Sequence, residues 1–266
     1  AENLTPCSGP SVSLAGGSIG SAASGTTYYH RGKIDDFRIY SRILTDTEIT
    51  ALGASKGRMP GATVTLGGAL NVDGDLTIQS GTLDVSASNY AINVGGSWRN
   101  SDGTFVARNG TVTLNGSAGG KTILMGGEKF NHLTINAGST VASWAPGDKL
   151  EVTGTLAVTQ GILAQAGTDL LAGTIAIGAG GMWRNMSTGD AVIGAGGVSN
   201  NGKIYLNGGG SGCGADEILI RSSSDGQQRA WSGTGTFDIA DVNVKDQGGS
   251  VTAYNSTSVG GNGWAF

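Results

Sequence analysis

Short runs of alternating apolar and polar residues recur from residue 62 to residue 266, for example ATVTLGG, LNVDGDLTIQSG, GTVTLNG, HLTINAG, LEVTGTLAVTQG and GKIYLNGGG. Alternation with a period of two predicts β-strands that bury one side, and the Gly or Asn-Gly that closes most runs predicts turns. Many runs follow one another within about ten residues, a spacing typical both of sandwich strands and of β-solenoid turns.

Internal repetition favours the solenoid. LNVDGDLTIQSG at 70–81 matches LEVTGTLAVTQG at 150–161, GGSWRN at 95–100 matches GGMWRN at 180–185, and GTVTLNG at 110–116 matches GKIYLNG at 202–208. The offset between matched blocks grows from 80 through 85 to 92 residues, as expected if insertions fall in loops between stacked turns. We therefore predict an all-β chain whose residues 62–266 form a parallel β-helix, with Trp98 and Trp183 as markers of equivalent places on different turns.

The first 58 residues follow a different pattern. Thr45 and Glu48 form a capping box, and Gly53 can end the helix, so one short helix of about two turns is predicted here. The preceding segment KIDDFRIYSRIL alternates as a half-buried strand does. Met59-Pro60-Gly61 is the predicted boundary between the two regions.

The segment YYHRGKIDDFRIYSRILTDTEITAL, residues 28–52, resembles the C-terminal end of bacterial laminin-G-like, or concanavalin A-like, jelly-roll domains. The resemblance implies a last strand followed by a short closing helix, so that residues 1–58 are a partial jelly-roll segment. Strands without the rest of the sandwich leave unpaired edges that favour association. The candidate assembly segment is Ile34, Phe37, Ile39 and Tyr40.

Two later segments, residues 110–138 and 218–266, resemble the right-handed β-helical repeats of large bacterial and archaeal surface proteins. The second of them carries a VNVKD…NST…GNGWAF ending that is similar to the closing signature of such arrays. The resemblance implies an extracellular, cell-surface protein of a prokaryote, either an adhesin or a fibre component.

Composition narrows the function further. Gly accounts for 49 of 266 residues, charged residues for 14%, and the net charge is −4. A chain with this charge has no electrostatic case for nucleic acid or anionic membrane partners. No apolar run approaches the roughly 18 residues of a membrane span. Cys7 and Cys213 are a candidate disulfide, within one chain or between neighbouring subunits, and two unpaired thiols are the equal alternative.

Candidate catalytic residues are few. His30 and His132 lack partners at metal-ligand spacing. The carboxylate pairs are Asp73 with Asp75 and Asp216 with Glu217, both beside Gly in predicted turns. Turn formation is the commoner role of such aspartates. They offer at most a weak calcium signal, and no cofactor is expected.

The sequence leaves three functions in competition. The leading interpretation is a structural extracellular protein without enzymatic activity, a subunit of a surface filament or the stalk of an adhesin, which binds copies of itself head to tail. The alternative is a carbohydrate-binding module in which Tyr28 and Tyr29, or the faces of Trp98 and Trp183, stack on surface glycans. A polysaccharide-cleaving β-helix enzyme is the second alternative.

Overall fold

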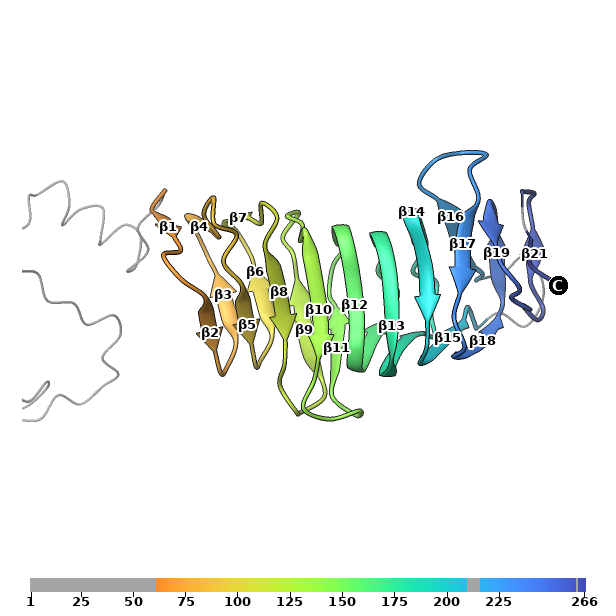
Figure 1. Ribbon diagram of the computed structural model, residues 1–266, viewed down its shortest axis with the longest axis horizontal. Helices are drawn as coiled ribbons and strands as arrows, with labels where there is room; N and C mark the ends of the chain where they lie inside the picture. Colours follow the sequence, from red (N-terminus) through yellow and green to blue (C-terminus); the bar gives the residue numbers. More distant parts are fainter. Residues whose placement is uncertain (1–60, 210–215, 262) are drawn as a thin grey trace, which may run out of the picture. The chain divides into compact units, whose positions relative to one another are not determined.

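The computed structural model describes residues 61–209, 216–261 and 263–266. All regular structure in these residues is β, with no helix. The strands coil into a parallel β-solenoid of about 9 turns, which confirms the predicted fold class (Figure 1). The predicted jelly-roll segment and its short helix lie outside the described residues, and both remain predictions.

The strands lie on three faces of the solenoid, and most turns contribute one strand to each face. The first face contains β1 (Thr63–Thr65), β4 (Thr82–Asp84), β7 (Thr104–Val106), the beginnings of β12 (Leu150–Gln165), β13 (Leu170–Asn185) and β14 (Ala191–Asn200), then β16 (Ile218–Ser222), β19 (Val242–Val244) and β21 (Thr257–Ser258).

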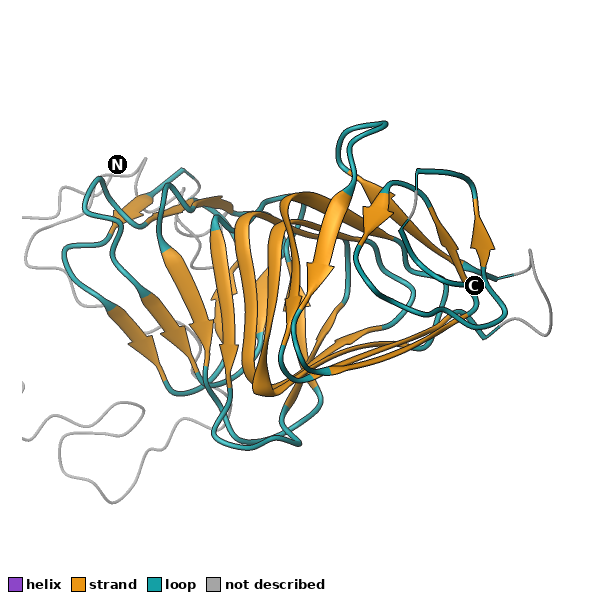
Figure 2. Ribbon diagram, turned by 45° about the vertical axis from the view of Figure 1, so that its right-hand side comes forward, coloured by secondary structure: helices purple, strands orange, loops and turns teal. Residues whose placement is uncertain are grey.

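The second face contains β2 (Leu70–Val72), β5 (Ile92–Val94), β8 (Thr111–Leu114), β10 (His132–Asn136), the middle parts of β12 and β13, the end of β14, β17 (Arg229–Ser232) and β20 (Gln247–Gly248). The third face contains β3 (Leu76–Ile78), β6 (Trp98–Asn100), β9 (Lys121–Leu124), β11 (Ser143–Pro146), the ends of β12 and β13, β15 (Lys203–Asn207) and β18 (Thr236–Ala240). Figure 2 shows the strands stacked side by side, with the loops at the corners.

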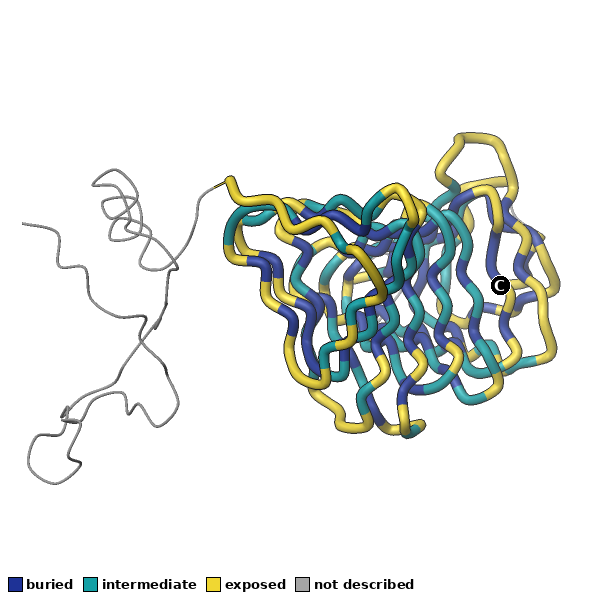
Figure 3. Tube along the Cα trace, turned by 60° about the vertical axis from the view of Figure 1, so that its left-hand side comes forward, coloured by how far each residue is buried: buried dark blue, intermediate teal, exposed yellow. Residues whose placement is uncertain are grey.

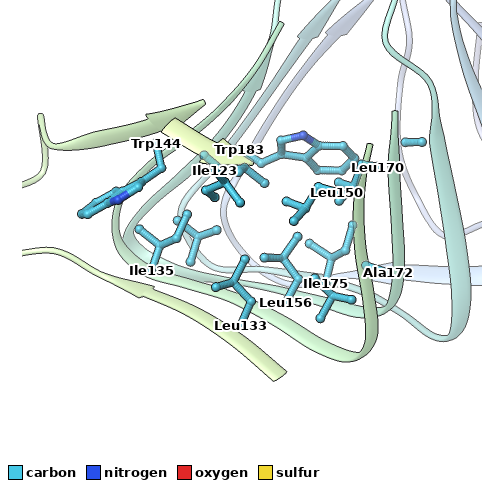
Figure 4. Packing of buried hydrophobic residues seen from close by; sticks show 14 of the residues in the cluster. Ile123, Leu133, Ile135, Trp144, Leu150, Leu156, Leu170, Ala172, Ile175 and Trp183 are labelled. Atoms are coloured by element: carbon cyan, nitrogen blue, oxygen red, sulfur yellow. The ribbon is translucent and has the colours of Figure 1, made fainter. Parts of the chain in front are cut away.

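Apolar side chains from all three faces fill the interior. In β8, for example, Val112 and Leu114 are buried while Thr111 and Thr113 face outward, so the predicted alternation holds. Figure 3 shows buried and less buried positions alternating along the trace. Parallel pairing in register stacks these side chains into columns, and Figure 4 shows residues of several turns converging on one core. Burial of each such side chain contributes about 1.5–3 kcal/mol, so the interior is the main source of stability.

The register corrects our interpretation of the sequence repeats. One column runs from Leu70 through Ile92, Val112 and Leu133 to Leu156. The sequence match of 70–81 with 150–161 instead aligned Leu70 with Leu150, which lies on the first face. Similarly, 110–116 lies on the second face and 202–208 on the third. The later block lies one face earlier in the first match, on the same face in the second (GGSWRN with GGMWRN) and one face later in the third, so the offset grows without loop insertions.

Real insertions occur nearer the C-terminus. Ile204 pairs with Phe237, 33 positions later, whereas Leu163 pairs with Trp183, 20 positions later. Part of the additional chain is the loop between β16 and β17, which projects from the solenoid in Figure 1. Loops of this kind leave the stacked strands undisturbed, because each strand still meets its partner on the neighbouring turn.

Candidate functional site

Trp98 lies inside the solenoid. Its side chain is fully buried, and its ring meets Phe105 and Phe130 edge to face at centroid distances of 4.8 and 5.1 Å. Edge-to-face contacts of this kind add about 0.5–1.5 kcal/mol beyond area burial. The indole Nε1 of Trp98 has no hydrogen-bond partner among the described residues. The ring is therefore an element of the core.

Trp183 is also fully buried, in a different environment. Its ring stacks on Trp231 at 6.2 Å, and Trp231 in turn meets Trp264 edge to face at 4.8 Å. The indole Nε1 of Trp183 donates a hydrogen bond to Gln165 Oε1 at 3.0 Å. Figure 4 shows Trp183 among the buried aliphatic side chains. A sugar ring cannot reach either buried indole, which excludes Trp98 and Trp183 as stacking platforms.

The two tryptophans mark the same face but not the same column. Strands β6, β9, β11, β12 and β13 follow one another on the third face, so the motifs lie four turns apart. The column below Trp183 runs through Leu163, Trp144 and Lys121. Trp98 instead pairs with Ile123, two residues beyond Lys121 along β9. The expectation of equivalent places is therefore correct for the face and wrong for the position along it.

The Gly-Gly pairs of both motifs allow close approach between neighbouring turns. A Cβ atom at Gly95 would overlap the backbone carbonyl of Asp73, and one at Gly181 would overlap that of Val158. Neither glycine has a positive φ. Glycine is therefore required here because there is no room for a Cβ atom, and not because of the backbone conformation. The shared GGxWRN pattern thus records a tight corner followed by an inward Trp.

The Asn of each motif closes the next corner. Asn185 is fully buried; its Nδ2 donates to Gly189 O at 2.6 Å, and its Oδ1 accepts from Ser187 N at 3.1 Å. Asn100 binds Gly103 in the same way, accepting from its N–H at 3.0 Å and donating to its carbonyl at 2.9 Å. Buried amides such as these provide hydrogen-bond partners for backbone groups that have no access to water. Each Asn lies two positions after an inward Trp, so the alternation of the strand points it inward too. The sequence pattern shows this only once the Trp is known to be buried.

The first candidate carboxylate pair has a structural role. Asp75 accepts a hydrogen bond from the backbone N–H of Ser97 on the next turn at 2.7 Å, and its other oxygen lies 3.5 Å from Arg99 Nε. Asp73 is exposed in the turn between β2 and β3. Asp75 therefore joins two neighbouring turns.

The second pair precedes β16. Glu217 accepts from Thr257 Oγ1 at 2.9 and 3.1 Å, which links β16 to β21 across the first face. Asp216 adopts a positive φ of 60° in an exposed turn. The geometry of both carboxylate pairs favours a structural role in turns over a catalytic one.

His132, the histidine within the described residues, also binds a backbone group. His132 Nδ1 accepts the N–H of Thr155 at 3.1 Å and so connects β10 to β12. Among the described residues, no group of three His, Cys, Asp or Glu side chains is placed to hold a metal ion.

Two shallow grooves open on the first face. One, of about 320 Å³, is lined by Glu151, Leu171 and Ala195 among others. The other, of about 290 Å³, lies between β7 and Phe130, and its charged lining residues are Arg108, Glu128 and Lys129. Glycoside hydrolysis requires two facing carboxylates. Each groove brings only one carboxylate to its lining.

Two aspartates in the described part of the chain have shifted pKa values. Burial raises the pKa of Asp190, whose carboxylate accepts the N–H of Leu219 at 2.9 Å. A bidentate pair with Arg108, at 2.6 and 2.8 Å, lowers the pKa of Asp84 to about 2. The bond from Leu219 opposes the raised pKa of Asp190, whereas the pair with Arg108 on the next turn causes the lowered pKa of Asp84.

Several predicted site residues lie outside the described part of the chain. They are Cys7, Tyr28, Tyr29, His30, Ile34, Phe37, Ile39, Tyr40 and Cys213. The disulfide and the assembly segment therefore stay predictions.

Several exposed apolar side chains lie at the two ends of the described solenoid, and two others lie at corners in its middle. Large hydrophobic residues that are at least half exposed are Val64, Val141, Met186, Tyr254, Val259 and Phe266. Val64 lies in the first strand, and the last three lie in the final turn. Strands β1, β2 and β3 pair only with β4, β5 and β6, so within the described residues their other edges carry no partner.

No protein-family model, curated protein or solved structure matches this chain. Within the described ranges, no helix has the length and apolar character needed to cross a membrane. The fold and the geometry of its surfaces are therefore the basis for a functional proposal.

Proposed function

We propose that the protein is a structural component of a prokaryotic cell surface, a filament subunit or adhesin stalk, whose solenoids stack head to tail. The extracellular location rests on the resemblance of residues 110–138 and 218–266 to β-helical surface proteins. The assembly rests on the distribution of apolar and hydrogen-bonding groups at the two ends of the solenoid.

The observation that carries the proposal is the position of the exposed hydrophobic side chains. Val64 is 58% exposed at one end, and Tyr254 and Phe266 are 65% and 51% exposed at the other. Monomeric proteins tolerate single exposed apolar residues, but a cluster at a surface marks an interaction site. Contact between the two ends removes Val64, Tyr254 and Phe266 from water.

Strand edges supply the second component. Within the described residues, β1, β2 and β3 each have one edge without a partner strand, which leaves a row of N–H and C=O groups on each of the three faces. Exposed edges of this kind are templates for a further strand from another chain. A stacked copy continues parallel pairing on all three faces at the spacing already present within the solenoid.

The competing functions receive less support. A carbohydrate-binding surface needs exposed rings, whereas Trp98 and Trp183 are fully buried. The candidate catalytic residue Asp75 binds the backbone of the next turn, and Glu217 binds Thr257 two turns away. These contacts favour a scaffold over a sugar-binding or sugar-cleaving site.

The test compares two valine substitutions in otherwise unchanged protein. Val64→Lys places a charge at the end of the solenoid, whereas Val141→Lys places one in an exposed corner between β10 and β11, where Val141 is 73% exposed. We expect negative-stain microscopy to show filaments for the wild type and Val141→Lys, and short particles for Val64→Lys. Monodisperse wild-type particles at high concentration would contradict the proposal.

A further inference from the structure

The outer surface of the second face is free of charge over eight successive turns. Its central column stacks in register from Asn71 and Asn93 through Thr113, Thr134, Ala157 and Ala176 to Ser199 and Ser232. Buried neighbours such as Val112 and Leu133 point inward, so the members of the column point outward.

The neighbouring outward positions are equally uncharged. Thr111 pairs with His132, and Thr155 with Thr174, while the Nδ1 of His132 is engaged by the N–H of Thr155. Arg229 is the one charged residue in the strands described for this face, and it is buried, with the same parity as the inward Trp231. The outward positions of these strands thus carry no Asp, Glu, Lys or Arg.

The other two faces differ from this one. On the first face, Glu151 and Arg221 occupy outward positions in the strands. On the third, the outward residues Arg184, Lys203 and Asp238 follow one another on successive turns, and Lys203 lies 3.6 Å from Asp238. The lack of charge is therefore specific to the second face and is not a general result of the low charge of the chain.

A charge-free sheet surface is suited to contact with an identical surface. In a twofold pair the same patch meets itself, so any uncompensated charge on it is repeated and repelled. Small outward side chains let two sheets approach to about 10 Å, and Asn and Thr can exchange hydrogen bonds across the contact. Asn93 Nδ2 already donates to Asn71 Oδ1 at 2.7 Å, which orders this part of the surface.

The size of the face sets the strength of the pair. Eight turns span seven intervals of about 4.8 Å, and strands of about four residues at about 3.3 Å per residue give a surface of roughly 34 by 13 Å. Two such faces bury roughly 900 Å² in total, slightly below the roughly 1,000 Å² of a stable interface, as in a weak, transient pair. An interface at this lower limit gives a concentration-dependent pair.

We propose that two copies of this chain associate laterally through their second faces, with the column from Asn71 to Ser232 at the centre of the contact. This contact lies along the side of the solenoid, so it is independent of the head-to-tail stacking proposed above. In a filament it joins two solenoid stacks side by side.

The test uses two alanines of the same strand. Ala157 lies in the central column, and Ala164 lies on the outer surface of the third face; both belong to β12 and are half-buried. In sedimentation equilibrium, we expect Ala157→Arg to raise the dissociation constant of the pair at least about tenfold, and Ala164→Arg to leave it within about twofold of the wild type. Circular dichroism of both variants checks that the solenoid is intact.

A charge-reversed mixture keeps the test informative. Ala157→Glu alone is expected to weaken the pair as Ala157→Arg does, and an equimolar mixture of the two variants is expected to restore association. A wild type that stays monomeric up to millimolar concentration, equal weakening by Ala157→Arg and Ala164→Arg, or no recovery in the mixture would overturn the proposal. Sedimentation of the wild type with crystalline cellulose, abolished by Ala157→Arg alone, would assign the face to a polymer and also overturn it.

The outcome is separable from that of head-to-tail stacking. Val64→Lys, placed at the end of the solenoid, is expected to remove long filaments and keep the side-by-side pair, whereas Ala157→Arg keeps single filaments and removes the pairing. Loss of both assemblies in Val64→Lys would show that lateral association depends on the ends and would contradict an independent side contact.

Discussion

Replacement of Trp183 by phenylalanine is expected to destabilise the solenoid more than the same replacement of Trp98. Both side chains are fully buried, so loss of the larger ring costs a similar transfer and cavity energy at each site. They differ in their polar contacts: Trp183 Nε1 donates to Gln165 Oε1 at 3.0 Å, whereas Trp98 Nε1 has no partner among the described residues.

The magnitude follows from this difference. In Trp183→Phe, the buried Oε1 of Gln165 loses the indole donor, and an unsatisfied buried acceptor costs about 1–3 kcal/mol. In Trp98→Phe, an indole N–H already without a partner is removed, so this additional cost does not arise. Trp183→Phe should therefore lower the free energy of unfolding by about 1–3 kcal/mol more than Trp98→Phe.

Guanidinium unfolding followed by circular dichroism measures both variants, and comparable m values establish that the same surface is exposed in each. Double substitution of Trp183→Phe with Gln165→Leu provides the control, because it removes donor and acceptor together and should recover part of the loss. An equal or larger loss for Trp98→Phe would refute the reasoning.

Three further predictions concern single contacts. Asn185→Ala leaves the Ser187 N–H without its buried acceptor and removes one of two donors to the Gly189 carbonyl, to which Gln165 Nε2 also donates at 3.1 Å. It should lower the free energy of unfolding by about 1–3 kcal/mol, against less than about 0.5 kcal/mol for exposed Asn115→Ala, as measured in guanidinium. Gly181→Ala should lower the thermal midpoint because its Cβ would overlap Val158 O, whereas Gly74→Ala, with open space around it, should not; equal midpoints would contradict the close approach. Because the pKa of Asp84 falls from 3.8 to about 2, its pair with Arg108 stabilises the fold above about pH 3.8 and is lost as the pH falls towards 2, so thermal midpoints between pH 4 and pH 2 should decline more steeply for the wild type than for Arg108→Ala.

The strand content and the solenoid were predictable because alternation and Gly-rich turns are local properties of the sequence. Runs such as GTVTLNG show which residues point inward, and the structure confirms it at Val112 and Leu114. The face to which a run belongs was not predictable. All three faces impose the same demands of inward apolar and outward polar residues, so Leu70 and Leu150 look alike in sequence although they lie on different faces.

The burial of the aromatic residues depends on contacts between residues that are distant in sequence. Trp183 could be placed on a repeated turn, but its burial against Trp231 and its bond to Gln165 arise from turns that the sequence does not connect. The uncharged second face is visible in sequence only after the register is known, since Asn93, Thr113 and Thr134 become one column through pairing. The composition shows that the chain has few charged residues. That the outward charged residues of the strands lie on two of the three faces can be seen only in the fold.

The head-to-tail account is tested most directly by X-ray diffraction from aligned filaments of the purified protein. Strands that lie across the filament axis predict a meridional reflection at about 4.8 Å. About nine turns per copy predict an axial subunit spacing of at least about 43 Å. A 4.8 Å reflection on the equator, or protein that forms no filaments at any concentration, would contradict the account.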